Sequence, residues 1–244
     1  MRPVRRGDSP LQQDFKNYQD AFPDLVARLG LYCSYCERAI PTGMAVEHLQ
    51  PKGLPKYVHL KGRWTNFLIA CVNCNSTKLK KDVDFALLLF PDRDNTFHAF
   101  EYRPDGVVIP APHLDTGLSQ VAEATLALTG LDKPFSRVRD ANGQLLALDR
   151  VSQRMEVWGK AQVSRAFLEE QPDNRALSST AIELARSSGY FSVWMTVFEG
   201  FPEFQKLLID AFPGTRESGC FDLQTSKSVT PCPNLDGLAH GGKI

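Results

Sequence analysis

Residues 33–36 read Cys-Ser-Tyr-Cys, and residues 71–74 read Cys-Val-Asn-Cys. A C-x-x-C pair supplies two thiolates from one tight turn, so two such pairs supply four. Structural zinc takes four ligands in a tetrahedron and binds thiolates well. The sequence therefore predicts one structural Zn²⁺ held by four cysteines, with a binding energy of about 10 kcal/mol that adds to folding. The ligands are Cys33, Cys36, Cys71 and Cys74.

The gap between the two pairs, residues 37–70, is longer than the roughly 15–20 residues that separate the pairs of a compact zinc ribbon. We therefore expect an inserted element that carries the chemistry. A redox pair and simple buried thiols are the alternatives, and two matched pairs favour zinc over both. Cys220 and Cys232 have a different spacing, and we interpret them as unpaired structural thiols.

The insert contains residues suited to phosphodiester hydrolysis. His48 offers an imidazole that can accept a proton near neutral pH and so activate water. Glu47 precedes it, and Asn75 directly follows the second cysteine pair. Their oxygens are hard ligands that suit Mg²⁺ or Mn²⁺. Lys78 lies about one helical turn after Asn75, on the same face, and could touch a phosphate.

Together these residues resemble the HNH endonuclease family. The matched pattern is C-x-x-C, an acid–His pair before a proline, an Asn before an apolar pair, and C-x-x-C-Asn with a following Lys. The resemblance implies a ββα-metal unit in which His48 is the base and Glu47 and Asn75 hold the catalytic divalent cation. It also implies that Asn66 bonds backbone and holds the His-bearing loop. Most of the family has Asp where this chain has Glu47.

A wider resemblance covers the chain to about residue 212. The stretches 28–37, 46–52, 64–68, 90–97 and 191–198 are similar to the HNH subunits of Septu-type anti-phage systems, the PtuB family. This resemblance implies a DNA-cutting effector that works with an ABC/SMC-like ATPase subunit, PtuA-like. Some retron defence systems carry the same pair. Contacts with the ATPase would fall on the helical half of the chain.

Charge and hydropathy set the broad class. The chain has 244 residues, 43% hydrophobic and 23% charged, and its net charge is zero. The segment 52–81 nevertheless carries seven basic residues and no acid. From it we predict that nucleic acid contacts Lys52, Lys78, Lys80 and Lys81. No apolar run is long enough to span a membrane and no signal peptide is evident, so we expect a cytoplasmic protein without a membrane partner.

The predicted fold class is α+β and mainly helical, with four regions. Residues 1–29 form a helical segment, with apolar residues spaced along 10–29, and residues 30–81 form the zinc-bearing nuclease unit. Residues 82–212 form a hairpin with its turn at Asp105-Gly106, followed by helices over 115–130, 144–170, 178–188, 191–198 and 202–212. Residues 213–244, rich in Gly, Pro, Ser and Thr, are expected to be a flexible tail.

Two other functions compete with a metal-dependent HNH endonuclease. A non-catalytic zinc module would bind nucleic acid or a protein partner, but it would not need Glu47, His48 and Asn75 around its cysteines. A sequence-specific restriction enzyme would need a recognition element, and we find no clear helix-turn-helix. The sequence leaves open DNA against RNA and nicking against double-strand cleavage.

Overall fold

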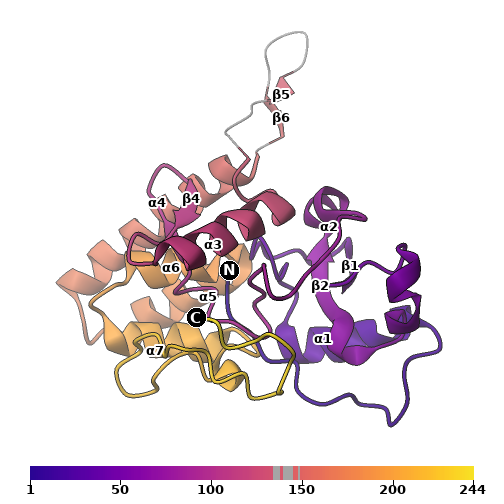
Figure 1. Ribbon diagram of the computed structural model, residues 1–244. Coiled ribbons are helices and arrows are strands. Elements are labelled where there is room, and N and C mark those ends of the chain that lie inside the picture. Colours follow the sequence, from indigo (N-terminus) through magenta and orange to yellow (C-terminus); the bar gives the residue numbers. More distant parts are fainter. Residues whose placement is uncertain (134–137, 140–144, 148) are drawn as a thin grey trace.

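The computed structural model describes residues 1–133, 138–139, 145–147 and 149–244. Figure 1 shows the short strands β1 and β2 with α1 and α2 on one side of the molecule, and helices α4 to α7 on the other. One cluster of buried apolar residues runs from Met1 to Ile244, so the four regions expected from the sequence share a core. The predicted α+β class is confirmed.

The N-terminal region is less helical than its pattern predicts. A 3-10 turn, η1 (Tyr18–Ala21), leads into α1 (Phe22–Leu29), and residues 10–17 form no helix. The prediction of a helix from residue 10 is therefore wrong. Pro23 lies in the first turn of α1, where its missing N–H removes no hydrogen bond, so the helix begins there.

The zinc-bearing region forms a two-stranded antiparallel sheet followed at once by a helix. Strand β1 (Met44–His48) pairs with β2 (Phe67–Cys71), with Glu47 opposite Leu68 and His48 opposite Phe67. The connection contains η2 (Pro55–Leu60) and η3 (Trp64–Asn66). Helix α2 (Val72–Lys78) starts immediately after β2. Glu47 and His48 thus lie at the end of β1, Asn66 lies just before β2, and Asn75 lies in α2.

The predicted hairpin and the helix after it are confirmed. Strands β3 (Phe100–Tyr102) and β4 (Val108–Pro110) are antiparallel. Gly106 adopts a φ of 75° in the turn between them, a conformation that glycine takes at little cost. Helix α3 (Thr116–Thr129) is capped by the Asp115 carboxylate and ends at Gly130 in the left-handed region, as the sequence predicts.

The C-terminal half is helical, and its boundaries lie close to those predicted. The strand segments β5 (Val138–Arg139) and β6 (Leu145–Ala147) precede it. The helix expected from residue 144 begins later, because the Asp149 carboxylate caps it and β6 occupies residues 145–147. Residue 144 itself lies outside the described residues. The helices are α4 (Arg150–Glu170), α5 (Arg175–Ser188), α6 (Phe191–Val197) and α7 (Pro202–Ala211).

The segment predicted to be a flexible tail packs against the rest of the molecule. Apart from η4 (Arg216–Ser218) it has little regular structure, yet Phe221 and Ile244 are buried. The Ile244 carbonyl accepts hydrogen bonds from the backbone N–H groups of Asn95 and Cys232. The buried sulfurs of Cys220 and Cys232 lie 3.3 Å apart. The prediction of a flexible tail rested on composition alone, whereas a few buried apolar side chains hold this segment against the core.

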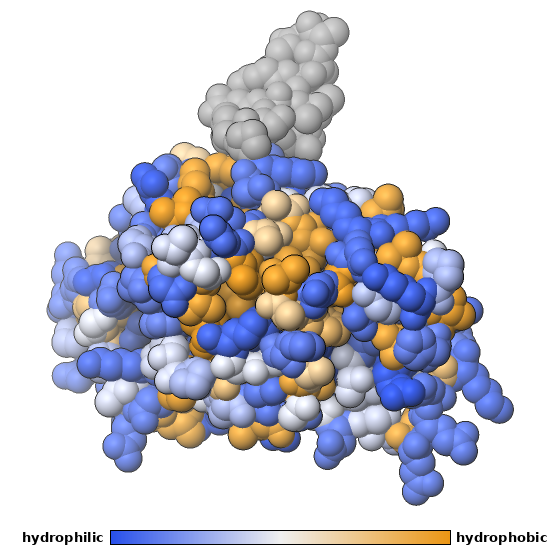
Figure 2. Space-filling view, viewed as in Figure 1, coloured by the Kyte–Doolittle hydropathy of each residue, from blue (hydrophilic) through white to orange (hydrophobic). Residues whose placement is uncertain are grey.

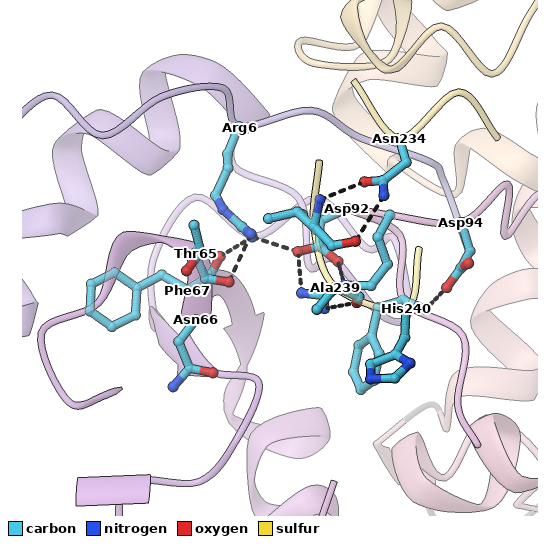
Figure 3. Close-up of polar contacts among 12 residues, drawn as sticks. Arg6, Thr65, Asn66, Phe67, Asp92, Asp94, Asn234, Ala239 and His240 are labelled. Carbon is cyan, nitrogen blue, oxygen red and sulfur yellow. Dashed lines mark hydrogen bonds and ion pairs between the residues drawn. The ribbon is translucent and has the colours of Figure 1, made fainter. Parts of the chain in front are cut away.

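A buried charge network joins distant parts of the chain (Figure 3). The Arg6 guanidinium lies 2.7 Å from the Asp92 carboxylate, which also pairs with Arg93. The same guanidinium donates hydrogen bonds to the carbonyls of Thr65 and Phe67 at the start of β2. Burial alone would raise the pKa of Asp92, but the two guanidiniums outweigh it and hold the pKa at about 2. Through Arg6, the network therefore connects the start of β2 to the buried Asp92.

Hydrophilic residues cover much of the face shown in Figure 2, with apolar residues gathered near its middle. Exposed apolar side chains also occur on α4, where Val163 and Phe167 are more than half exposed. Among the helices of the described segments, none has the length and apolar character required to cross a bilayer.

Candidate metal centre and adjoining cavity

The two cysteine pairs meet in a buried cluster. The sulfurs of Cys33, Cys36, Cys71 and Cys74 all lie within 4.8 Å of one another. The Cys36 and Cys71 sulfurs are 3.8 Å apart. A tetrahedron with zinc–sulfur bonds of about 2.3 Å has edges of about 3.8 Å, so this spacing fits one ion. The predicted ligand set is confirmed as a cluster that can bind a structural Zn²⁺.

Backbone and side-chain donors surround these sulfurs. The N–H of Cys71 points at the Cys33 sulfur, and the N–H of Cys74 points at the Cys71 sulfur, both at 3.4 Å. Hydrogen bonds from the neighbouring thiols hold the pKa of Cys71 well below its ordinary value. The Arg150 guanidinium from α4 lies 3.3 Å from the Cys74 sulfur. These donors offset the negative charge that four thiolates would bring to one zinc ion.

His48 ends β1 and is held as a neutral imidazole. Its ring packs edge-on against Tyr18 and Phe67, with centroids 4.8 and 5.1 Å apart. Burial lowers the pKa of His48 to about 4, with nearby lysines acting in the same direction. Its Nε2 lies 3.0 Å from the Lys61 carbonyl, which can only accept, so Nε2 carries the proton. Among the residues that the structure describes, none is hydrogen-bonded to Nδ1, whose lone pair can accept a proton from water.

Asn66 holds the loop that follows β1. Its Oδ1 accepts a hydrogen bond from the Gln50 N–H at 2.8 Å, and its Nδ2 donates to the Gln50 carbonyl at 3.0 Å. The side chain is buried and so protected from water. This geometry agrees with the backbone-bonding role that the resemblance implies for Asn66; a direct catalytic role stays a prediction.

Glu47 and His48 are neighbours on β1, and their side chains have different partners. The Glu47 carboxylate is buried, and its Oε1 lies 2.9 Å from the Lys78 ammonium and 3.2 Å from the Tyr35 hydroxyl, which donates to it. Lys78 also donates to the His48 carbonyl at 2.8 Å. The phosphate contact of Lys78 stays a prediction; in this structure the ammonium is buried and bonded to two residues of β1.

A cavity of 530 Å³ opens beside these residues. Its walls include Glu47, His48 and Asn75, so the structure brings the three predicted catalytic-site residues together. Lys52 and Lys80 also line it, in agreement with the predicted basic surface. Lys81 does not: its ammonium lies 3.4 Å from the Ala127 carbonyl on α3. The basic surface at the cavity is therefore smaller than the predicted set of four lysines.

The donor set partly fits the divalent cation that the resemblance implies. Both contacts recorded for the Glu47 carboxylate in the described chain go to Oε1, while Glu47 lines the cavity. Oε2 and the Asn75 amide oxygen could therefore ligate a cation from the cavity side. Among the described residues that line the cavity, Glu47 is the single acid, and Lys78 already balances its charge. Mg²⁺ is often held by one or two carboxylates together with substrate phosphates, so such a site would be weak without substrate.

The start of the chain contributes to this site, which was not predicted from the sequence. Tyr18, Gln19 and Phe22, from η1 and α1, form one wall of the cavity. The sequence pattern placed Tyr18 and Phe22 in an apolar stripe, which accounts for their packing against the core but not for their second role. Their spacing of four, which puts both on one helical face, was the available signal.

Comparison with known proteins adds no assignment. No protein-family model matches this sequence, and neither does any curated protein.

Proposed function

We propose that this protein is an HNH-type endonuclease that hydrolyses phosphodiester bonds in DNA, with His48 as the general base. The observation that carries the proposal is the state of His48. The imidazole is neutral, because its pKa is lowered to about 4. Its Nε2–H donates a hydrogen bond to the Lys61 carbonyl, and the ring lines a cavity that lysines also line. A neutral imidazole with one free nitrogen is what water activation requires at neutral pH.

The roles of the other residues follow from their positions. Lys52 and Lys80 would attract the phosphate backbone to the cavity. Asn66 would keep the loop after β1 in place, and the four cysteines would hold a structural zinc that joins the two ends of the β1–β2 unit. Glu47 and Asn75 would hold Mg²⁺ or Mn²⁺, which supplies charge stabilisation at the phosphate when bound.

The resemblance to Septu-type nuclease subunits extends this proposal to a partner. An ABC/SMC-like ATPase subunit would hold the nucleic acid and direct cleavage in an anti-phage complex. Two features support a need for such a partner: the zero net charge of the chain and the small basic surface at the cavity. An apolar groove of 550 Å³ between α4 and α5, lined by Val163, Phe167 and Leu177, offers a surface on the predicted half.

The test is plasmid cleavage by the zinc-loaded protein with Mg²⁺ or Mn²⁺, alone and with an ATPase encoded next to its gene. We expect His48→Ala to abolish cleavage with zinc content and circular dichroism unchanged. Lys81→Ala is the matched control, because Lys81 lies outside the cavity wall. Cleavage by His48→Ala at the wild-type rate would exclude His48 as the base. Binding of nucleic acid with no cleavage under any condition would instead favour the non-catalytic zinc module.

A further inference from the structure

The cavity beside His48 is lined by two kinds of side chain. Lys52, Lys80 and Asn75 are polar. Tyr18, Phe22 and Met44 are apolar or aromatic. Its volume of 530 Å³ lies within the range of about 300–1,000 Å³ that is usual for sites of small ligands. A lining that combines lysines with aromatic rings suits a ligand that is anionic at one end and flat and apolar at the other.

Tyr18 contacts both His48 and Lys52. Its ring packs edge-on against His48 at 4.8 Å between centroids, and the Lys52 ammonium lies over the ring, 3.5 Å from its centroid. Tyr18 and Phe22 are only half-buried, although both pack against the core. A lysine that rests on an aromatic ring can turn to a phosphate when one arrives, which frees the ring face for another flat group.

We propose, resting on the proposed function, that this cavity binds one unpaired nucleotide of single-stranded DNA. Its base lies against Tyr18 and Phe22, and its phosphate lies toward Lys52, Lys80 and His48. Aromatic side chains recognise the face of a base without regard to its identity, and lysines follow the backbone. The exposed amide of Gln19 lies on the same wall and can bond a base edge.

Duplex DNA does not suit this site. In a duplex each base face is covered by its neighbours, so an aromatic wall has no face to contact unless a base leaves the stack, at a cost of a few kcal/mol. Lysines alone would bind duplex and single strands alike. The aromatic wall beside the proposed base therefore makes an unpaired nucleotide the preferred substrate.

The test measures binding with the zinc-loaded, full-length His48→Ala chain, which does not cut under the proposed function. The probe is an oligonucleotide with 2-aminopurine at its centre, used as a single strand and as a perfect duplex. We expect quenching of 2-aminopurine fluorescence with the single strand and none with the duplex. Replacing Tyr18 by Leu should weaken single-strand binding about fivefold to a hundredfold. Tyr18→Phe, which keeps the ring, should bind like the parent.

Zinc content of each variant shows that the fold is retained, and Phe22→Leu provides a second aromatic deletion if Tyr18→Leu fails to fold. Equal affinity for duplex and single strand, or equal affinity of Tyr18→Leu and Tyr18→Phe, would overturn the proposal. With His48 intact, equal cleavage of the two substrates would leave the nuclease but remove this inference. Selective single-strand binding without cleavage would leave the nucleotide site but remove the nuclease.

Discussion

The Lys78 ammonium of α2 lies 2.9 Å from Oε1 of Glu47 on β1, and both side chains are almost wholly shielded from solvent. Because Lys78 also donates to the His48 carbonyl, one cation ties the helix that carries Asn75 to the strand end that carries the proposed base. The ion pair therefore fixes α2 against the end of β1.

Removing one member of this pair should be costly. We expect Lys78→Met to lower the free energy of unfolding by roughly 3–5 kcal/mol, because it leaves the Glu47 carboxylate buried without its partner. The double variant Lys78→Met/Glu47→Gln should be less destabilised than the sum of the single variants, since no unpaired charge remains. Chemical denaturation of zinc-loaded protein measures both. Strictly additive effects would mean that the two side chains do not interact.

Asn66 offers a test of the loop after β1. Asn66→Ala leaves the N–H and the carbonyl of Gln50 without this partner, and we expect a loss of about 2 kcal/mol or more in unfolding free energy. Asn66→Asp keeps the acceptor for the Gln50 N–H but sets a buried carboxylate oxygen against the Gln50 carbonyl, so it should be no more stable than Ala. Thermal unfolding and plasmid cleavage should rank the three proteins in the same order. A fully stable Ala variant would contradict the role.

The cysteine cluster predicts one zinc per chain. Replacing Cys33 or Cys74 by Ser should abolish bound zinc and unfold the β1–β2–α2 unit, because metal binding contributes folding energy. Cys220→Ser and Cys232→Ser are the matched controls, since both thiols are buried but lie outside the cluster. Elemental analysis by mass spectrometry and circular dichroism, before and after a chelator, give the readout. Zinc retained by the cluster variants would place the ion elsewhere.

Asp92 predicts a pH dependence of stability. Its pKa of about 2 in the folded chain lies below the ordinary value of 3.8, so its pairing with Arg6 and Arg93 stabilises the fold above pH 4. That contribution is lost as the pH falls through 2. The stability difference between wild type and Asp92→Asn should thus be largest above pH 4 and shrink below it.

Denaturation curves of the two proteins, taken at matched zinc loading across this range, measure that difference. Asp173→Asn, at an exposed acid, controls for the loss of one negative charge. A difference that stays constant from pH 7 down to pH 2 would show that the buried network does not depend on the charge of Asp92.

Features that depend on neighbours in sequence were the ones that could be predicted. The cysteine pairs, the cap of α3 at Asp115 and the turn at Gly106 each follow from local chemistry, and the structure contains all three. The side-chain environment of Lys78 could not be predicted in this way. Helical spacing puts it on the face of Asn75, but its burial arises from the packing of α2 against β1, which no local pattern encodes.

The order of the C-terminal segment also could not be predicted from local sequence. Its Gly, Pro and Ser content is typical of a loosely ordered tail, yet Ile244 is buried and bonded to Asn95, far away in sequence. Tyr18 likewise entered the candidate site only through the folding of η1 over β1, since its spacing resembles that of any core residue. Contacts between distant segments decided each of these outcomes.

Arg6 determines whether the β1–β2–α2 unit can fold outside this protein. In sequence this unit is one continuous segment. The carbonyls of Thr65 and Phe67, on either side of Asn66, nevertheless accept hydrogen bonds from Arg6, which lies outside it. Transplanting residues 30–81 into another scaffold would leave those carbonyls without their hydrogen-bond donor and would destabilise the turn that Asn66 stabilises. A working graft would need an engineered cation in the place of Arg6, together with an acid to balance it as Asp92 does.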